Sequence, residues 1–136
     1  MFVREKPTSD DKDLYNKISG GGWFEKYAEW CVDRERGYYI ICTGKRGVET
    51  PYFFYMNYKD EVIEIWVWDL SDIPWSNGFE DVDVWIPESL SNDTDEIAHI
   101  IRDAYSDNVF ESLGGYVGIR TPKIKEIIFN VEERKS

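Results

Sequence analysis

The sequence is poor in the residues that most often bind metals or form covalent cross-links. It contains one histidine and two cysteines among 136 residues. Cys31 and Cys42 fit neither a CxxC redox pair nor a zinc knuckle. We therefore expect both to be small buried hydrophobic residues rather than metal ligands or a disulfide.

Long apolar runs are also missing. No stretch approaches the roughly 20 apolar residues that span a bilayer, and the N-terminal residues 1–13 lack the apolar core of a signal peptide. These absences predict a cytoplasmic protein that does not enter a membrane.

Lysine and arginine are absent from residues 60–101, which hold twelve acidic residues. The rest of the chain is close to neutral, with 15 acidic and 16 basic residues, so this segment carries the excess behind the net charge of −11. Nucleic acids and anionic membranes are negatively charged, so we expect neither as a direct partner, whereas a basic protein fits. The acids are interleaved with large aromatic residues, namely Trp66, Trp68, Trp75, Phe79 and Trp85.

The sequence shows no catalytic motif. His99 has Asp95 and Asp103 four residues away on either side, but no third metal ligand and no GxSxG nucleophile motif accompany it. We interpret it as an ordinary Asp–His pair on a solvated helix face. We therefore expect no catalytic residue, no metal site and no cofactor. An enzyme remains an alternative, because the carboxylate pairs that act in glycoside hydrolysis are defined by their separation in space, which a sequence does not show.

Three helices follow from the apolar periodicity. A cap at Ser9 begins the first helix, and the glycines at 20–22 end it. Phe24, Tyr27, Ala28 and Cys31 follow the helical template, which predicts a second helix from about Trp23 to Glu35. The third helix is predicted to follow a cap at residues 92–93 and to end before Gly114. Its apolar face consists of Ile97, Ile100, Ile101, Ala104 and Tyr105.

Alternating apolar residues predict strands at residues 52–58, 62–69 and 82–86, and the run of β-branched and aromatic residues at 38–42 predicts another. The segment 122–135 fits a helix or a strand, and its β-branched content favours a strand. The length predicts a single domain over residues 1–136. The expected fold is α+β: an antiparallel β-meander of four to five strands packed against about three helices, in the order α-α-β-β-β-β-α-β.

Residues 69–85, with the sequence DLSDIPWSNGFEDVDVW, place acids beside aromatic residues. With its short length, its mixed α+β pattern and its lack of a signal peptide, the chain resembles the small acidic immunity proteins that bacteria pair with secreted or contact-delivered toxins. The resemblance is to a class and not to a motif. It implies a protein that binds and blocks a cognate basic toxin, with nucleases among such toxins.

In this segment the acids lie beside aromatic residues whose burial in the core is least expected, so we expect partner contacts there. The predicted partner-binding residues are Asp69, Asp72, Trp75, Phe79, Glu80, Asp81 and Asp83. The main alternative is a small enzyme or a ligand-binding α+β domain with an aromatic pocket. A structural subunit or adaptor contacted through Trp75 and Phe79 is a third interpretation. In a fourth interpretation, the acids are only solvated surface residues and the aromatic residues are fully buried in the core. A pocket with converging polar groups would favour the main alternative, and a flat acidic face would favour the inhibitor.

Overall fold

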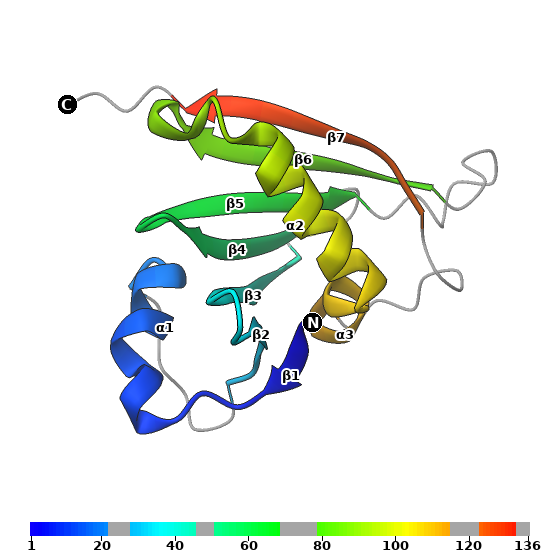
Figure 1. Cartoon of the computed structure of the whole chain (residues 1–136). Helices are drawn as coiled ribbons and strands as arrows, with labels where there is room; N and C mark the ends of the chain where they lie inside the picture. Colours follow the sequence, from blue (N-terminus) through cyan, green and yellow to red (C-terminus); the bar gives the residue numbers. More distant parts are fainter. Residues whose placement is uncertain (22–27, 46–50, 69–78, 115–122, 133–136) are drawn as a thin grey trace.

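The computed structural model describes residues 1–21, 28–45, 51–68, 79–114 and 123–132. In this part of the chain, seven strands form one sheet in which spatial order follows chain order from β1 to β7 (Figure 1). The strands are β1 (Val3–Glu5), β2 (Trp30–Asp33), β3 (Tyr38–Lys45), β4 (Tyr52–Tyr58), β5 (Glu61–Trp68), β6 (Phe79–Pro87) and β7 (Lys123–Glu132). The helices are α1 (Lys12–Ile18), α2 (Thr94–Ser106) and α3 (Val109–Gly114), with short 3₁₀ helices η1 (Ser9–Asp11) and η2 (Glu88–Leu90).

Each strand from β1 to β6 pairs antiparallel with the next, and β7 pairs parallel with β6. Parallel neighbours need a long crossover, since the chain must return to the end of the sheet at which the first strand began. The segment that contains α2 and α3 supplies this crossover. Both helices lie across one face of the sheet (Figure 1).

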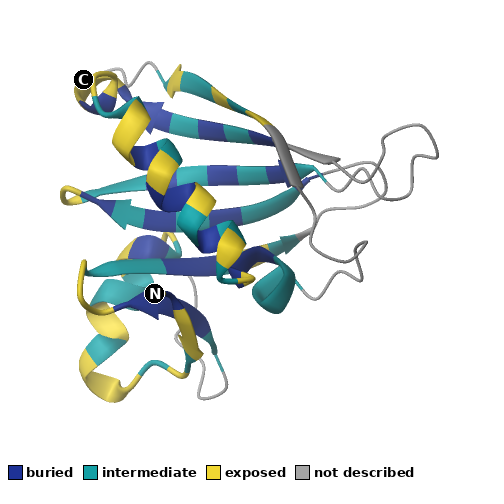
Figure 2. Cartoon of the chain, turned by 45° about the vertical axis from the view of Figure 1, so that its right-hand side comes forward, coloured by how far each residue is buried: buried dark blue, intermediate teal, exposed yellow. Residues whose placement is uncertain are grey.

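The main core lies between that face and α2. Ile63, Ile65 and Val67 of β5 are fully buried there, together with Ile97 and Ile101 of α2. The intervening residues of β5 are only half-buried, and Figure 2 shows the two classes alternating along the strand. Successive strand side chains point to opposite faces, so these half-buried residues belong to the second face of the sheet.

The second face has its own smaller core, beneath α1. Ile18 of α1 packs with Trp30, Val32 and Ile41, and the Trp30 and Tyr39 rings lie 4.6 Å apart between centroids. Helices therefore cover β2 and β3 from both sides. For this reason all four residues of β2 are buried.

The predicted second helix, Trp23 to Glu35, is wrong where the structure describes it. Residues 30–33 form strand β2, and residues 22–27 lie outside the described residues. A surface helix buries one stripe, whereas here consecutive residues must be buried on both faces. Trp30, Cys31 and Val32 suit that environment as aromatic, small apolar and β-branched residues.

The predicted order α-α-β-β-β-β-α-β and the count of four to five strands are also wrong. The sheet gains β1 and β2 at its first edge, and β1 has only three residues, too few to show a period. The helix expected to run to Gly114 is divided at Asn108, where a φ of 60° separates α2 from α3. The central strands β3 to β6 and their antiparallel pairing are confirmed. The final strand is confirmed too, but it pairs in parallel.

The face predicted for α2 is confirmed and supports a stability test. Ile101 is fully buried between α2 and the sheet. Ile101→Asp is expected to lower the free energy of unfolding by about 4 kcal/mol or more, because it buries an unpaired charge and removes packed methyl groups. Urea unfolding measures the change. Arg102→Asp, at the adjacent exposed position, serves as the control, and an equal loss there would show that α2 does not bury this face.

Candidate functional site

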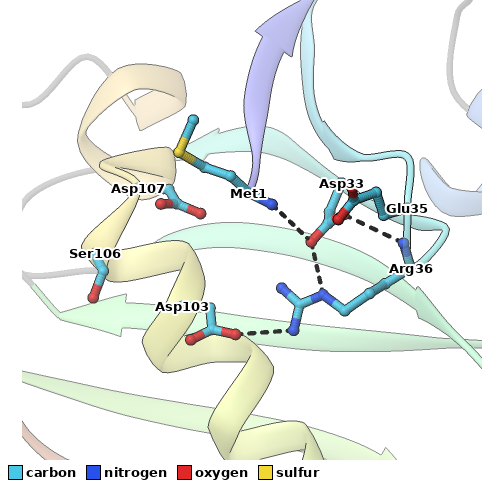
Figure 3. Close-up of a pocket in the computed structure, with 7 residues that line it drawn as sticks. All are labelled: Met1, Asp33, Glu35, Arg36, Asp103, Ser106 and Asp107. Carbon is cyan, nitrogen blue, oxygen red and sulfur yellow. Dashed lines mark hydrogen bonds and ion pairs between the residues drawn. The ribbon is translucent and has the colours of Figure 1, made fainter.

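A cavity of about 340 Å³ lies where the N-terminal residues, the β2–β3 turn and α2 meet. Charged and polar side chains converge on it, as Figure 3 shows. Its lining residues are Met1, Asp33, Glu35, Arg36, Asp103, Ser106 and Asp107. A convergent pocket of this kind is the feature that the enzyme alternative requires.

The charged groups in this cavity are largely paired with one another. Arg36 donates from Nε to Asp33 Oδ2 at 2.7 Å and from Nη1 to Asp103 Oδ2 at 2.9 Å. The Met1 amine lies 3.3 Å from Asp33 Oδ2, and the Phe2 backbone N–H donates to Asp107 Oδ2 at 2.9 Å. The Arg36 guanidinium also lies 5.6 Å from the centroid of the Tyr38 ring. This network, which we call the clamp, joins the two N-terminal residues, the end of β2 with the following turn, and the C-terminal end of α2.

Asp33 is the clamp's central residue and is 1% exposed. Burial alone would raise the pKa of this carboxyl. Hydrogen bonds from the Arg36 side chain and backbone, with the Met1 amine, outweigh burial and hold the pKa of Asp33 below its ordinary value. Its ionised form therefore stabilises the fold above the ordinary carboxyl pKa, and this stability is lost as the pH falls through the lowered pKa.

The lowered pKa of Asp33 predicts that the protein loses stability in acid. The melting temperature should fall between about pH 5 and pH 2, and Asp33→Asn should remove part of this dependence. The variant should also be less stable at pH 7, on the order of 2 kcal/mol, because Arg36 loses a charged partner. Thermal melts over this pH range measure both effects. Exposed Asp10→Asn is the control, and a matching change in its pH profile would rule out the clamp as the source.

The single histidine lies outside this cavity's lining. His99 is 74% exposed, and its Nε2 is 3.6 Å from Asp103 Oδ2, so the predicted Asp–His pair on a solvated face is confirmed. No three His, Cys, Asp or Glu side chains among the described residues are close enough to hold a metal ion. Both cysteines are free thiols that pack with the main core; Cys31 is buried, as predicted, whereas Cys42 is only half-buried. Burial raises the pKa of Cys31 to about 11, which disfavours a reactive thiolate.

A second candidate lies on the sheet face opposite α2, over strands β4, β5 and β6. We call it the aromatic face. Its residues are Phe53, Tyr55, Glu64, Trp66, Trp68, Asp83 and Trp85, and each is half-buried. Cross-strand pairing brings them together, since Trp66 lies opposite both Phe53 and Asp83, and Glu64 opposite both Tyr55 and Trp85.

The rings of the aromatic face pack against one another. The Trp66 ring lies 5.1 Å from the Trp85 ring and 5.4 Å from the Phe53 ring, measured between centroids. The Phe53 contact is edge-to-face and the Trp85 contact is tilted, both within the range that favours aromatic pairs. Such packing fixes rigid, flat apolar surfaces without burying them in the main core.

Two carboxylates are anchored among these rings. Glu64 Oε1 accepts hydrogen bonds from Trp66 Nε1 at 2.8 Å and from the Tyr55 hydroxyl at 3.1 Å. Asp83 Oδ2 accepts from Trp68 Nε1 at 2.8 Å, and its Oδ1 is 3.5 Å from Asn130 Nδ2. In both carboxylates, neutral donors hold one oxygen, and no described residue donates a short hydrogen bond to the second oxygen.

Among the described residues, no lysine, arginine or histidine is paired with the carboxylates of the aromatic face. Within the described ranges, ion pairs involve Glu5, Glu29, Asp33, Asp93 and Asp103, and none involves Glu64 or Asp83. Trp85 Nε1 is a buried donor without an acceptor, but so is Trp30 Nε1 in the small core, so this property does not mark a site. What distinguishes the aromatic face is a pair of carboxylates that indole N–H groups hold in place and that form no ion pair with any described residue.

The predicted partner-binding residues divide into three groups. Asp69, Asp72 and Trp75 lie outside the described residues. Phe79, Glu80 and Asp81 form the first three positions of β6, so the strand begins earlier than expected. Asp83 lies on the aromatic face, opposite Trp66.

Sequence reasoning missed the residues that surround Asp83. Glu64, Trp66 and Trp68 were expected on one face of a strand, but that face was not linked to Phe53, Tyr55 or Trp85. The missing information was the strand register, because alternation assigns a residue to a face and not to a neighbour. The one available signal was that Glu64 and Asp83 alternate with buried residues in two successive strands.

No protein-family model, curated protein or solved structure matches this chain. No helix in the described parts of the chain is long and apolar enough to cross a membrane.

Proposed function

We propose that this chain is an immunity-type protein that binds a cognate basic toxin through the aromatic face and blocks it. The observation that supports this proposal is the pair of carboxylates, Glu64 and Asp83, fixed by indole N–H groups and lacking basic partners among the described residues. A partner that brings its own cations would complete these pairs.

The chemistry of the aromatic face favours arginine over lysine as that cation. A guanidinium group is planar, stacks on indole rings and donates in a fork that matches a carboxylate. Trp66 and Trp85 offer ring surface next to Glu64, and Trp68 offers it next to Asp83. Tryptophan anchors of this kind dominate the energy of many protein interfaces.

Long-range charge supports the same partner. The segment 60–101, which has no lysine or arginine, includes β5 and β6, so Glu64 and Asp83 of the aromatic face come from the most acidic segment of the chain. Such a field steers basic proteins and speeds their association. A nuclease presents a basic active site built for phosphates, and an acidic, aromatic surface complements it.

The small-enzyme alternative receives less support. Its best candidate is the cavity beside Arg36, where Asp33, Asp103 and Asp107 are all engaged by arginine or backbone donors. Those contacts hold the fold together. The adaptor interpretation depends on Trp75 and Phe79; Trp75 lies outside the described residues, and Phe79 is the first residue of β6.

The first test measures recognition by the aromatic face. The double variant Glu64→Gln, Asp83→Asn should weaken binding of an acetylated hexa-arginine peptide about tenfold or more, because it removes both charges while conserving side-chain shape. Hexa-lysine should bind the wild-type protein more weakly than hexa-arginine does. Tryptophan fluorescence titration gives both affinities.

The matched control removes the same charge elsewhere. Glu88→Gln, Asp95→Asn changes two exposed acids, on η2 and on the first turn of α2. It should bind hexa-arginine nearly as well as the wild-type protein does. Equal losses in the two double variants would show that binding follows net charge and that the aromatic face is not a site.

The second test concerns the biological role. The protein encoded by the neighbouring reading frame should be basic and toxic, and co-expression of this chain should restore growth. Association of the purified proteins should slow as salt rises from roughly 50 to 500 mM, because screening weakens steering. A non-toxic neighbour, or full protection by Glu64→Gln, Asp83→Asn, would contradict the proposed role.

A further inference from the structure

Strand β7 forms one edge of the sheet and has ten residues, whereas β1 at the other edge has three. In Figure 1 no described strand or helix lies beyond β7. An edge strand presents unpaired backbone N–H and C=O groups, and a long edge is a template for another strand. Most proteins shorten or cover such an edge.

Exposed apolar side chains gather at the edges of this sheet. Among the described residues, the exposed large hydrophobic side chains are Met1, Val3, Ile128 and Val131, all in or next to an edge strand. Ile128 is 40% exposed and lies in register with Asp83, on the side of the aromatic face. Val131 is 49% exposed and lies in register with Ile86, on the opposite side. Strand β7 therefore offers apolar contacts on both faces.

The charge of β7 differs from that of its neighbours. Its sequence, KIKEIIFNVE, contains two lysines and two glutamates, whereas all ionisable residues of β5 and β6 are acidic. Two copies of a chain with a net charge of −11 repel each other over most of their surface. Strand β7 is an edge at which they can meet without adding like charges.

We propose that two copies of this chain pair antiparallel through β7, which joins their sheets across a two-fold axis. If the two sheets are to be continuous, residues that oppose each other across the axis must lie on the same face. Even-numbered and odd-numbered residues of β7 lie on opposite faces, so the two-fold axis must pass through a residue and not between two residues. Centring the axis on Ile128 places two exposed isoleucines opposite each other and opposes no like charges within β7. Centring it on Phe129 opposes Glu126 with Glu132, and centring it on Ile127 opposes Glu126 with Ile128.

This dimer is independent of the proposed function and responds to salt in the opposite direction. Screening reduces repulsion between two acidic copies, so dimerisation should strengthen with salt, whereas binding of a basic partner should weaken. The same salt series therefore distinguishes a failure of the dimer from a failure of the proposed function, because each process can be observed without the other.

Sedimentation velocity of the full chain over a concentration series, at roughly 50 and 500 mM NaCl, tests the assembly. The dimer fraction should rise with both concentration and salt. Ile128→Lys should weaken dimerisation about tenfold or more, because it opposes two lysines at the centre. Val3→Lys, at the similarly exposed position on the other edge, should leave the dimer unchanged. A monomer under all conditions, or loss of the dimer only in Val3→Lys, would overturn the proposal.

A cysteine pair tests the register. In the proposed arrangement, Ile128→Cys places two thiols directly opposite each other, with Cβ atoms about 5 Å apart, and mild oxidation should yield a disulfide-linked dimer. Glu126→Cys places its two thiols about 13 Å apart along the strands and should stay monomeric on a non-reducing gel, like the wild-type protein. Cross-linking of Glu126→Cys but not Ile128→Cys would overturn this register and with it the proposal.

Discussion

The two-residue period of strands β5 and β6 is the constraint on which the rest of the structure depends. Ile63 and Ile65 must face α2 to fill the main core, and the pleat then forces Glu64 and Trp66 onto the opposite face. Strand β6 has the same alternation, with Val82 and Val84 buried in the main core. The carboxylates and indoles meet because two neighbouring strands keep the same period and pair in register. A slip of one residue would bury the acids and expose the core.

Much of the central sheet follows from the sequence because its signal is local. Alternation located β4 to β6, a run of β-branched and aromatic residues located β3, and the 3.6-residue period located α2 with its buried isoleucines. The failure at residues 30–33 has a physical origin. Strand β2 is buried on both faces and shows no alternation, so its apolar residues fit a helical template by coincidence. The pairing of β1 and the parallel addition of β7 are long-range features, which a local pattern does not encode.

The site was predicted less completely than the fold. The acidic, aromatic character of residues 60–101 is visible in the sequence, and it predicts partner contacts at residues 69–83. Of these residues, Asp83 lies on the aromatic face, opposite Trp66. The rest of that face could not be predicted, because Phe53 and Trp85 come from the strands on either side of β5. Cross-strand hydrogen bonds such as Trp68 to Asp83 join residues 15 apart. No spacing rule predicts such pairs before the register is known.

The most direct test of the aromatic face is an NMR titration that follows the tryptophan indole N–H signals of the ¹⁵N-labelled protein as hexa-arginine is added. Trp66 and Trp68 donate to the two carboxylates, whereas Trp30 is fully buried beneath α1. We expect the Trp66 and Trp68 signals to shift together with the same affinity while the Trp30 signal stays fixed. Unmoved Trp66 and Trp68 signals at saturating peptide would contradict this expectation.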